Sequence, residues 1–212
     1  MNKIQIDIVS DIACPWCAIG YARLEQAIEQ LGPEYEFTIK WHAFELNPSH
    51  SGQGVPILPA LAKKYGRSED EMRENQNHMM AIAKELGLNF DKLQERLTAN
   101  TFDAHRLLKW ADKFGQQTAM KQAFFDAYFG QGLDVSDHRV LLDCVNALGL
   151  DVEKAQDILD TEQFSVTVRD EEVQYQRAGV TSVPAFIVNN KYLISGAQEP
   201  QTLVQAMREI AS

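Results

Sequence analysis

The sequence predicts an α/β protein in which an all-helical block interrupts one small sheet. Strand-like alternation of polar and apolar residues occurs near both ends of the 212-residue chain, and helical periodicity fills the long stretch between them. A Cys-x-x-Cys pair, Cys14 and Cys17, directly follows the first predicted strand. Because one sheet can take strands from both ends of a chain, the helical middle is predicted to be an insertion.

The N-terminal part reads as a strand–helix–strand unit. Residues 3–9 alternate like a strand, and residues 36–46 are predicted to form a second strand. Apolar residues between them recur at helical spacing until Gly32-Pro33 ends the helix.

The middle of the chain begins with a loop and continues as helices. Residues 47–58 are rich in proline and glycine, which predicts a loop. Ser68 and Glu71 form a capping box before a helix over 72–86. Further helices are predicted over 103–114, 116–129, 137–148, 151–159 and 162–178.

The C-terminal part reads as two strands and a helix. Residues 185–188 and 191–195 are predicted strands joined by an Asn-Asn turn, and Pro200 starts a last helix. We therefore expect a discontinuous domain of residues 1–48 and 162–212, with residues 49–161 as an inserted helical domain.

Charge and composition exclude several partners. Thirty acidic against twenty basic residues give a net charge of −10, which repels nucleic acid and anionic membranes. No apolar stretch is long enough for a membrane span, and the alternating N-terminus lacks the pattern of a secretory signal. We expect a cytoplasmic protein, in which a close cysteine pair indicates chemistry rather than a structural disulfide.

The cysteine pair stands where the first helix begins. Pro15 suits the first helical position, so Cys14 is predicted to be the N-cap, with the amides of Trp16 and Cys17 directed at its sulfur. Such a position lowers the pKa of a thiol below the ordinary value of about 8.5 and favours the reactive thiolate. Cys14 is thus the expected exposed nucleophile, and Cys17, one turn deeper, the expected resolving thiol.

Structural zinc is the alternative for the pair. Zinc needs four ligands, and Cys144 and the scattered histidines form no second close pair. Cys144 lies on an apolar helical face and is interpreted as an unreactive core thiol. We expect no metal and no cofactor besides the cysteine pair itself.

A second segment, far from the cysteine pair in the sequence, also carries a functional signal. Val183-Pro184 runs directly into the predicted strand at Ala185. With the Cys-Pro-Trp-Cys motif and the helical insertion, the Gly-Val-Thr-Ser-Val-Pro-Ala-Phe run resembles the DsbA family of thioredoxin-fold proteins. Ser10–Cys17, Phe44–Pro48 and Ile194–Gln198 resemble its FrnE-type cytoplasmic branch.

This resemblance covers essentially the whole chain and implies a thioredoxin-like fold with an inserted all-helical domain. It implies a cis peptide bond before Pro184, which would pack against the active-site disulfide. It also implies that Val183 offers main-chain groups to an extended substrate.

The sequence departs from the family pattern at two places. Members often carry a buried acid six residues before the first cysteine, where this chain has Ile8. Asp11 is the candidate that could support the cysteines instead, although a solvated turn aspartate is the more common interpretation. His42-Ala43 stands where the family has a basic residue and proline, and His42 is interpreted as a surface strand residue.

The resemblance implies thiol–disulfide exchange on protein or peptide substrates, with glutathione as a possible co-substrate. A glutathione-dependent isomerase or transferase, similar to 2-hydroxychromene-2-carboxylate isomerase, is the second hypothesis. A non-catalytic binding or chaperone module is the third. Its groove would use Phe124, Phe125, Tyr128 and Phe129, which at helical spacing are more often core residues.

Overall fold

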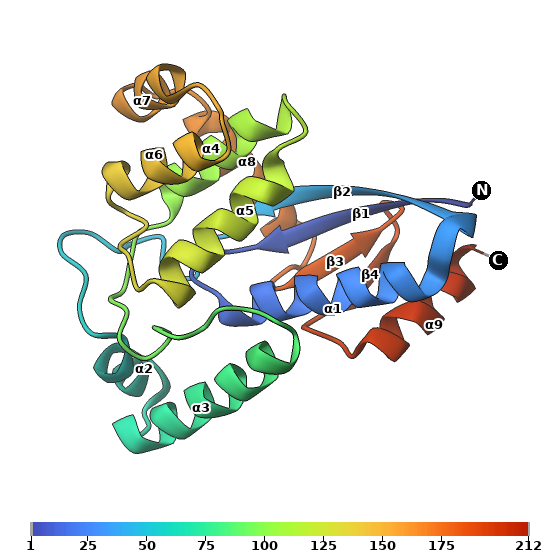
Figure 1. The fold of residues 1–212 in the computed structure, drawn as a ribbon, viewed down its shortest axis with the longest axis horizontal. Coiled ribbons are helices and arrows are strands. Elements are labelled where there is room, and N and C mark those ends of the chain that lie inside the picture. The colour runs from blue at the N-terminus through green and yellow to red at the C-terminus, as the bar shows by residue number, and fades with distance from the viewer. Residues whose placement is uncertain (1, 212) are drawn as a thin grey trace.

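Four strands from both ends of the chain form one mixed sheet in the order β2-β1-β3-β4 (Figure 1). The computed structural model describes residues 2–211. Strand β1 (Asn2–Ser10) pairs parallel with β2 (Tyr35–Ala43) and antiparallel with β3 (Ala185–Val188). Strand β3 pairs antiparallel with β4 (Tyr192–Ser195). The prediction of a single sheet with strands from both ends is confirmed.

Helices α1 (Pro15–Leu31) and α9 (Pro200–Ala211) pack against each other beside this sheet (Figure 1). Helix α1 ends where Gly32 adopts a φ of 70°, a left-handed value that glycine adopts without strain. Both cysteines of the pair, on the first turn of α1, belong to the same buried cluster as Ile8 of β1. The first turn of α1 is therefore anchored to the sheet.

The inserted block joins β2 to the C-terminal strands and lies toward one end of the sheet (Figure 1). Helix α8 packs against both β2 and α4, and so connects the block to the sheet. The helical elements between β2 and β3 are α2 (Ile57–Tyr65), α3 (Glu69–Glu85), α4 (Phe102–Asp112), α5 (Gln117–Phe125), the π-helical turn η2 (Asp126–Gly130), α6 (His138–Ala147), α7 (Val152–Asp160) and α8 (Ser165–Arg177). The architecture is a thioredoxin-like fold with a helical insertion. The exact domain boundaries given above stay a prediction.

Two elements differ from the sequence prediction. Helix α2 begins at Ile57, inside the proline-rich segment 47–58 that was predicted to be a loop. Pro59 is the third residue of this helix, and the first turn needs no backbone donors, so the proline is tolerated there. Strand β2 ends at Ala43 instead of residue 46, because its partner β1 ends at Ser10 opposite Ala43; further on, the Leu46 amide donates to the Asp11 side chain.

The capping box of α3 is present as predicted. The Glu71 amide donates to the Ser68 hydroxyl, and the Glu71 carboxylate accepts from the Ser68 amide. Within residues 2–211, no helix combines the length and apolar character needed to cross a membrane.

Candidate active site

The cysteine pair lies on the first turn of α1, where the sequence places it. Cys14 is the N-cap residue, with extended backbone angles (φ −97°, ψ 108°), and Pro15 is the first helical residue. Cys14 is 5% exposed and Cys17 is fully buried. The order of burial agrees with the prediction, but Cys14 is not exposed as expected, because the segment carrying Val183 lies against it.

The Cys14 thiol points across the chain rather than along the helix. Its Sγ donates to the carbonyl oxygen of Val183 at 3.6 Å. The predicted cap, with amides directed at the sulfur, is absent, since Cys17 N–H donates instead to the Cys14 carbonyl oxygen at 3.0 Å. A protonated thiol is a donor, and the Val183 carbonyl is the acceptor within its reach.

The segment before β3 is held against α1. The Val183–Pro184 peptide bond is cis, as the resemblance implies. The Pro184 carbonyl oxygen accepts from the Gly196 amide at 2.8 Å, which ties this segment to the end of β4. A Cβ on Gly20 would lie 3.0 Å from Pro184 Cγ, so α1 and this proline approach as closely as a glycine allows.

Asp11 is not the solvated turn residue that the sequence suggests. Only 1% of it is exposed, and its Oδ2 accepts from the Leu46 amide at 2.7 Å. Its Oδ1 accepts from the Ala13 amide at 3.3 Å and lies 3.4 Å from His105 Nε2. Burial raises the pKa of Asp11, but hydrogen bonds from His105 and the Leu46 amide outweigh it and hold the pKa below its ordinary value. Asp11 is therefore a buried carboxylate.

His105 of α4 is the side chain that contacts the Asp11 carboxylate from the helical block. Its Nε2 also lies 3.2 Å from the carbonyl oxygen of Phe44. Because a carbonyl oxygen can only accept, Nε2 carries the hydrogen and shares it between Phe44 and Asp11. Burial lowers the pKa of His105. A neutral imidazole thus joins the helical block to the turn before Cys14.

Cys17 is enclosed among apolar and charged groups. Burial raises the pKa of its thiol well above the ordinary value, and the neighbouring Cys14 sulfur raises it further. Lys121 of α5 acts in the opposite direction through its charge. Cys17 therefore stays a thiol at neutral pH unless a base takes its proton.

Comparisons with known proteins identify the family of this chain. Residues 5–208 match the family of DsbA-like thioredoxin domains. The chain belongs to this family. This DsbA-family chain also superposes on a probable DsbA oxidoreductase from Streptomyces coelicolor with a TM-score of 0.90 and 31% identity, covering 97% of the chain and 89% of that structure.

Two more distant structures share the fold. The cytosolic disulfide reductase DsbM from Pseudomonas aeruginosa, solved with glutathione, gives a TM-score of 0.67 at 18% identity, covering 97% of this chain and 98% of DsbM. A 2-hydroxychromene-2-carboxylate isomerase gives 0.72 at 15% identity, covering 97% of this chain and 95% of the isomerase. At these identities the likeness concerns the fold alone.

Apolar side chains next to the cysteine pair reach solvent. Trp16, inside the motif, is 37% exposed, and so is Leu46, whose amide binds Asp11.

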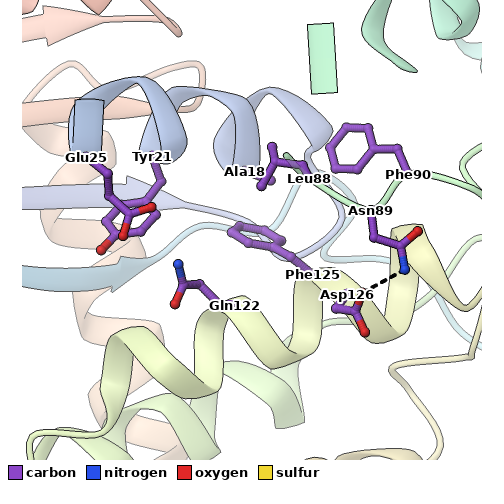
Figure 2. Close-up of a pocket in the computed structure, with 9 residues that line it drawn as sticks. All are labelled: Ala18, Tyr21, Glu25, Leu88, Asn89, Phe90, Gln122, Phe125 and Asp126. Atoms are coloured by element: carbon purple, nitrogen blue, oxygen red, sulfur yellow. Dashed lines mark hydrogen bonds between the residues drawn. The ribbon is translucent and has the colours of Figure 1, made fainter. Parts of the chain in front are cut away.

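A small recess of about 100 Å³ lies between α1 and α5 (Figure 2). Phe125 points into it, and Asn89 Nδ2 donates to Asp126 Oδ1 at 2.9 Å along its rim. Its lining residues include neither cysteine, nor Val183 or Pro184; they are Ala18, Tyr21, Glu25, Leu88, Asn89, Phe90, Gln122, Phe125 and Asp126. The aromatic rings of α5 and η2 that the binding-module hypothesis would place in a groove are buried in the core. Of these rings, Phe125 lines the recess.

Cys144 and His42 lie elsewhere. Cys144 is half-buried on α6, and burial raises the pKa of its thiol to about 11, which agrees with an unreactive thiol. His42 is not the surface residue predicted from the sequence. Its Nε2 lies 2.7 Å from Asp7 Oδ1 and its Nδ1 lies 2.9 Å from Glu171 Oε1, so it joins β1 and β2 to α8.

His105 and Lys121 lie near the pair but were not among the predicted site residues. Each lies on a helix of the inserted block, about a hundred positions from the cysteines. One signal for Lys121 exists in the sequence. The lysine stands four residues before Phe125, on the apolar face of its helix.

Proposed function

We propose that this protein is a thiol–disulfide oxidoreductase that uses Cys14 and Cys17 on protein or peptide substrates. The observation that carries the proposal is the position of the two thiols. Cys14 begins α1 with its sulfur 3.6 Å from the Val183 carbonyl oxygen, and Cys17 lies fully buried one helical turn further on.

Cys14 is assigned the first step. Its thiolate attacks a substrate disulfide, one substrate sulfur leaves as a thiolate, and a mixed disulfide forms on Cys14. The N-cap position supports this role, because the positive end of the dipole of α1 favours an anion at that residue even without an amide bonded to the sulfur.

Cys17 is assigned the second step. It attacks the Cys14 sulfur, the second substrate sulfur leaves, and a Cys14–Cys17 disulfide remains. The substrate gains two electrons and the protein loses two, and the reverse sequence oxidises a substrate dithiol. Because both thiols lie on one helical turn, this intramolecular attack has a high effective concentration.

The surroundings favour an extended peptide as substrate. Val183 lies two residues before β3, outside the paired strands, where its main-chain groups can bond to an extended peptide. Trp16 and Leu46 offer apolar contact beside the thiols. Glutathione is a tripeptide thiol and fits the same chemistry as a co-substrate. We infer a cytoplasmic setting, in which thiols are kept reduced.

The direct test replaces Cys17 with alanine and looks for trapped partners. Cys17→Ala should accumulate adducts of proteins or glutathione at Cys14 in a thiol-rich extract, seen on non-reducing gels and by mass spectrometry. Cys14→Ala should trap none, and Cys144→Ala should behave like the parent. If Cys17→Ala traps nothing and the parent reduces no small disulfide, the proposal is wrong.

The double variant separates this proposal from the glutathione-dependent class. Cys14→Ala/Cys17→Ala should lose all exchange activity. If it kept activity on a glutathione conjugate or a chromene carboxylate, an isomerase or transferase function would replace the exchange reaction.

A further inference from the structure

His42 of β2 lies between two carboxylates that belong to different elements. Its Nε2 is 2.7 Å from Asp7 Oδ1 of β1, and its Nδ1 is 2.9 Å from Glu171 Oε1 of α8. A neutral imidazole carries a hydrogen on only one ring nitrogen, whereas an imidazolium carries one on each. Because ionised carboxylate oxygens accept hydrogen bonds and do not donate them, these two contacts require the imidazolium form of His42.

The neighbours of His42 keep both carboxylates ionised at neutral pH. Burial raises the pKa of Glu171, but His42 and Lys109 outweigh it and lower that pKa to about 2. Burial also raises the pKa of Asp7, and the His42 hydrogen bond outweighs it. Burial lowers the pKa of His42, whereas its hydrogen bonds to Asp7 and Glu171 raise it above the ordinary value. The charged and titratable groups around the imidazole and its partners are Asp7 of β1, Lys40 of β2, Lys109 of α4, and Glu171 and Tyr175 of α8.

Loss of the His42 proton breaks one of the two contacts, because a nitrogen lone pair would then face a carboxylate. Strands β1 and β2 are paired along their length, with His42 opposite Val9, so Asp7 and His42 stay together. Helix α8 is joined to β2 through side chains such as Glu171, which also bonds the Ala43 amide at 3.2 Å. The contact between His42 and Glu171 is therefore the one that opens.

Tyr175 of α8 connects His42 to the segment that leads into β3. Its ring centroid lies 4.8 Å from that of the His42 imidazole. The Val180 amide donates to the Tyr175 carbonyl oxygen at 3.0 Å. Tyr175 and Val180 share a buried cluster with Ala185, and the half-buried Val183 packs against this cluster. The position of α8 therefore determines how Val183 is held beside the cysteine pair.

We propose that His42 is a positioning residue whose positive charge holds the Val183–Pro184 segment against Cys14, and that loss of its proton loosens this hold. The imidazolium binds α8 to the sheet, and the end of α8 carries the segment. With a neutral His42, α8 has one contact to the sheet fewer. The hold is complete below the ordinary histidine pKa of about 6.5 and is lost as pH rises through the raised pKa of His42.

The protonation state of His42 can be observed directly by NMR. Protein labelled with ¹⁵N is recorded from about pH 6 to about pH 9, and the ring nitrogens of each histidine are followed. Both His42 nitrogens should carry a hydrogen at about pH 6, and one nitrogen should lose it at higher pH. A His42 ring with an unprotonated nitrogen at about pH 6 would overturn the proposal.

Hydrogen exchange measures how firmly the segment is held. The Gly196 amide donates to the Pro184 carbonyl oxygen, and the Val180 amide to that of Tyr175, so both amides report on the segment. Their protection, relative to the exchange rates of unstructured peptides, should fall roughly 10-fold between about pH 6 and about pH 9, because a charge-assisted hydrogen bond is lost. Protection that does not change over this range would overturn the proposal.

Two substitutions separate charge from shape. His42→Arg keeps a cation at every pH, so the protection should stay high up to about pH 9. His42→Gln has no charge, so the protection should be low already at about pH 6. His78→Arg makes the same exchange at an exposed position on α3 and should follow the parent. A His42→Arg protein that loses protection as the parent does, or a His42→Gln protein as protected as the parent at about pH 6, would overturn the proposal.

The consequence for catalysis rests on the proposed function. The KM for a disulfide-bonded peptide should rise about 2-fold or more in the parent relative to His42→Arg between about pH 6 and about pH 8.5, because the segment that meets the substrate is held less often. Equal pH dependence of KM in the two proteins would overturn the positioning role. If neither protein reduces the peptide, the proposed function fails, whereas the hydrogen-exchange results still support or overturn the role of His42.

Discussion

The sulfur of Cys14 lies 3.6 Å from the carbonyl oxygen of Val183, a residue 169 positions further along the chain. This contact places the first cysteine of the N-terminal motif against the segment that leads into β3. A thiol can donate to that oxygen and a thiolate cannot, so the contact changes with the state of Cys14. Under the proposed function, a substrate sulfur and its main chain would meet the protein at this pair of residues.

We expect iodoacetamide to modify Cys14 in preference to Cys17. Cys17 is fully buried and its pKa is raised well above the ordinary value, so few thiolates are available at about pH 7.5. The comparison uses Cys17→Ser and Cys14→Ser, both with Cys144→Ala, and measures alkylation rate by mass spectrometry. Faster reaction of Cys17 would reverse the roles assigned to the two thiols.

Gly20→Ala should destabilise the protein by about 1–2 kcal/mol. The added Cβ would lie 3.0 Å from Pro184 Cγ and 3.2 Å from Phe186 Cζ, which is overpacking. The better helix propensity of alanine, worth up to about 1 kcal/mol, offsets part of this loss. Urea unfolding measures the change, with the exposed Gln26→Ala on the same helix as control. A Gly20→Ala protein as stable as the parent would mean that the proline segment is free to move away.

Acid should weaken the contact between the sheet and α8. Burial raises the pKa of Glu171, but His42 and Lys109 outweigh it and lower that pKa to about 2. A lowered folded-state pKa gives stability that is present above about pH 4.5 and lost as pH falls toward 2. The loss should be on the order of 3 kcal/mol in the parent.

Glu171→Gln should lack this acid-sensitive part of the stability. Its free energy of unfolding should change less than that of the parent between about pH 4.5 and 2.5, when both are measured by urea titration. Glu162→Gln makes the same chemical change at an exposed position and should follow the parent. Parallel curves for Glu171→Gln and the parent would show that the Glu171 contacts contribute nothing measurable.

Local sequence signals were sufficient for much of the fold. Pro15 after Cys14 marks the start of α1, and Ser68 with Glu71 marks the start of α3. The start of helix α2 was missed because the proline-rich segment 47–58 was interpreted as a loop, although a proline in a first turn is tolerated. Helix starts could therefore be predicted where the residues that cap or begin the helix lie within a few positions of one another.

The surroundings of the cysteines could not be predicted in the same way. The burial of Asp11 depends on His105, 94 residues away, and that of Cys14 on Val183, 169 residues away. Lys121 reaches the core only because α5 packs against β2. Such contacts arise from the tertiary fold, and no local pattern around Asp11 encodes them.

The redox equilibrium of the Cys14–Cys17 couple tests the central claim most directly. Purified protein is equilibrated in buffers of varied reduced and oxidised glutathione, quenched with acid, and alkylated to count free thiols by mass spectrometry. We predict that Cys14 and Cys17 change together between dithiol and disulfide in one two-electron transition, while Cys144 stays free. Two cysteines that remain alkylatable at every glutathione ratio, or that react independently of each other, would contradict the account.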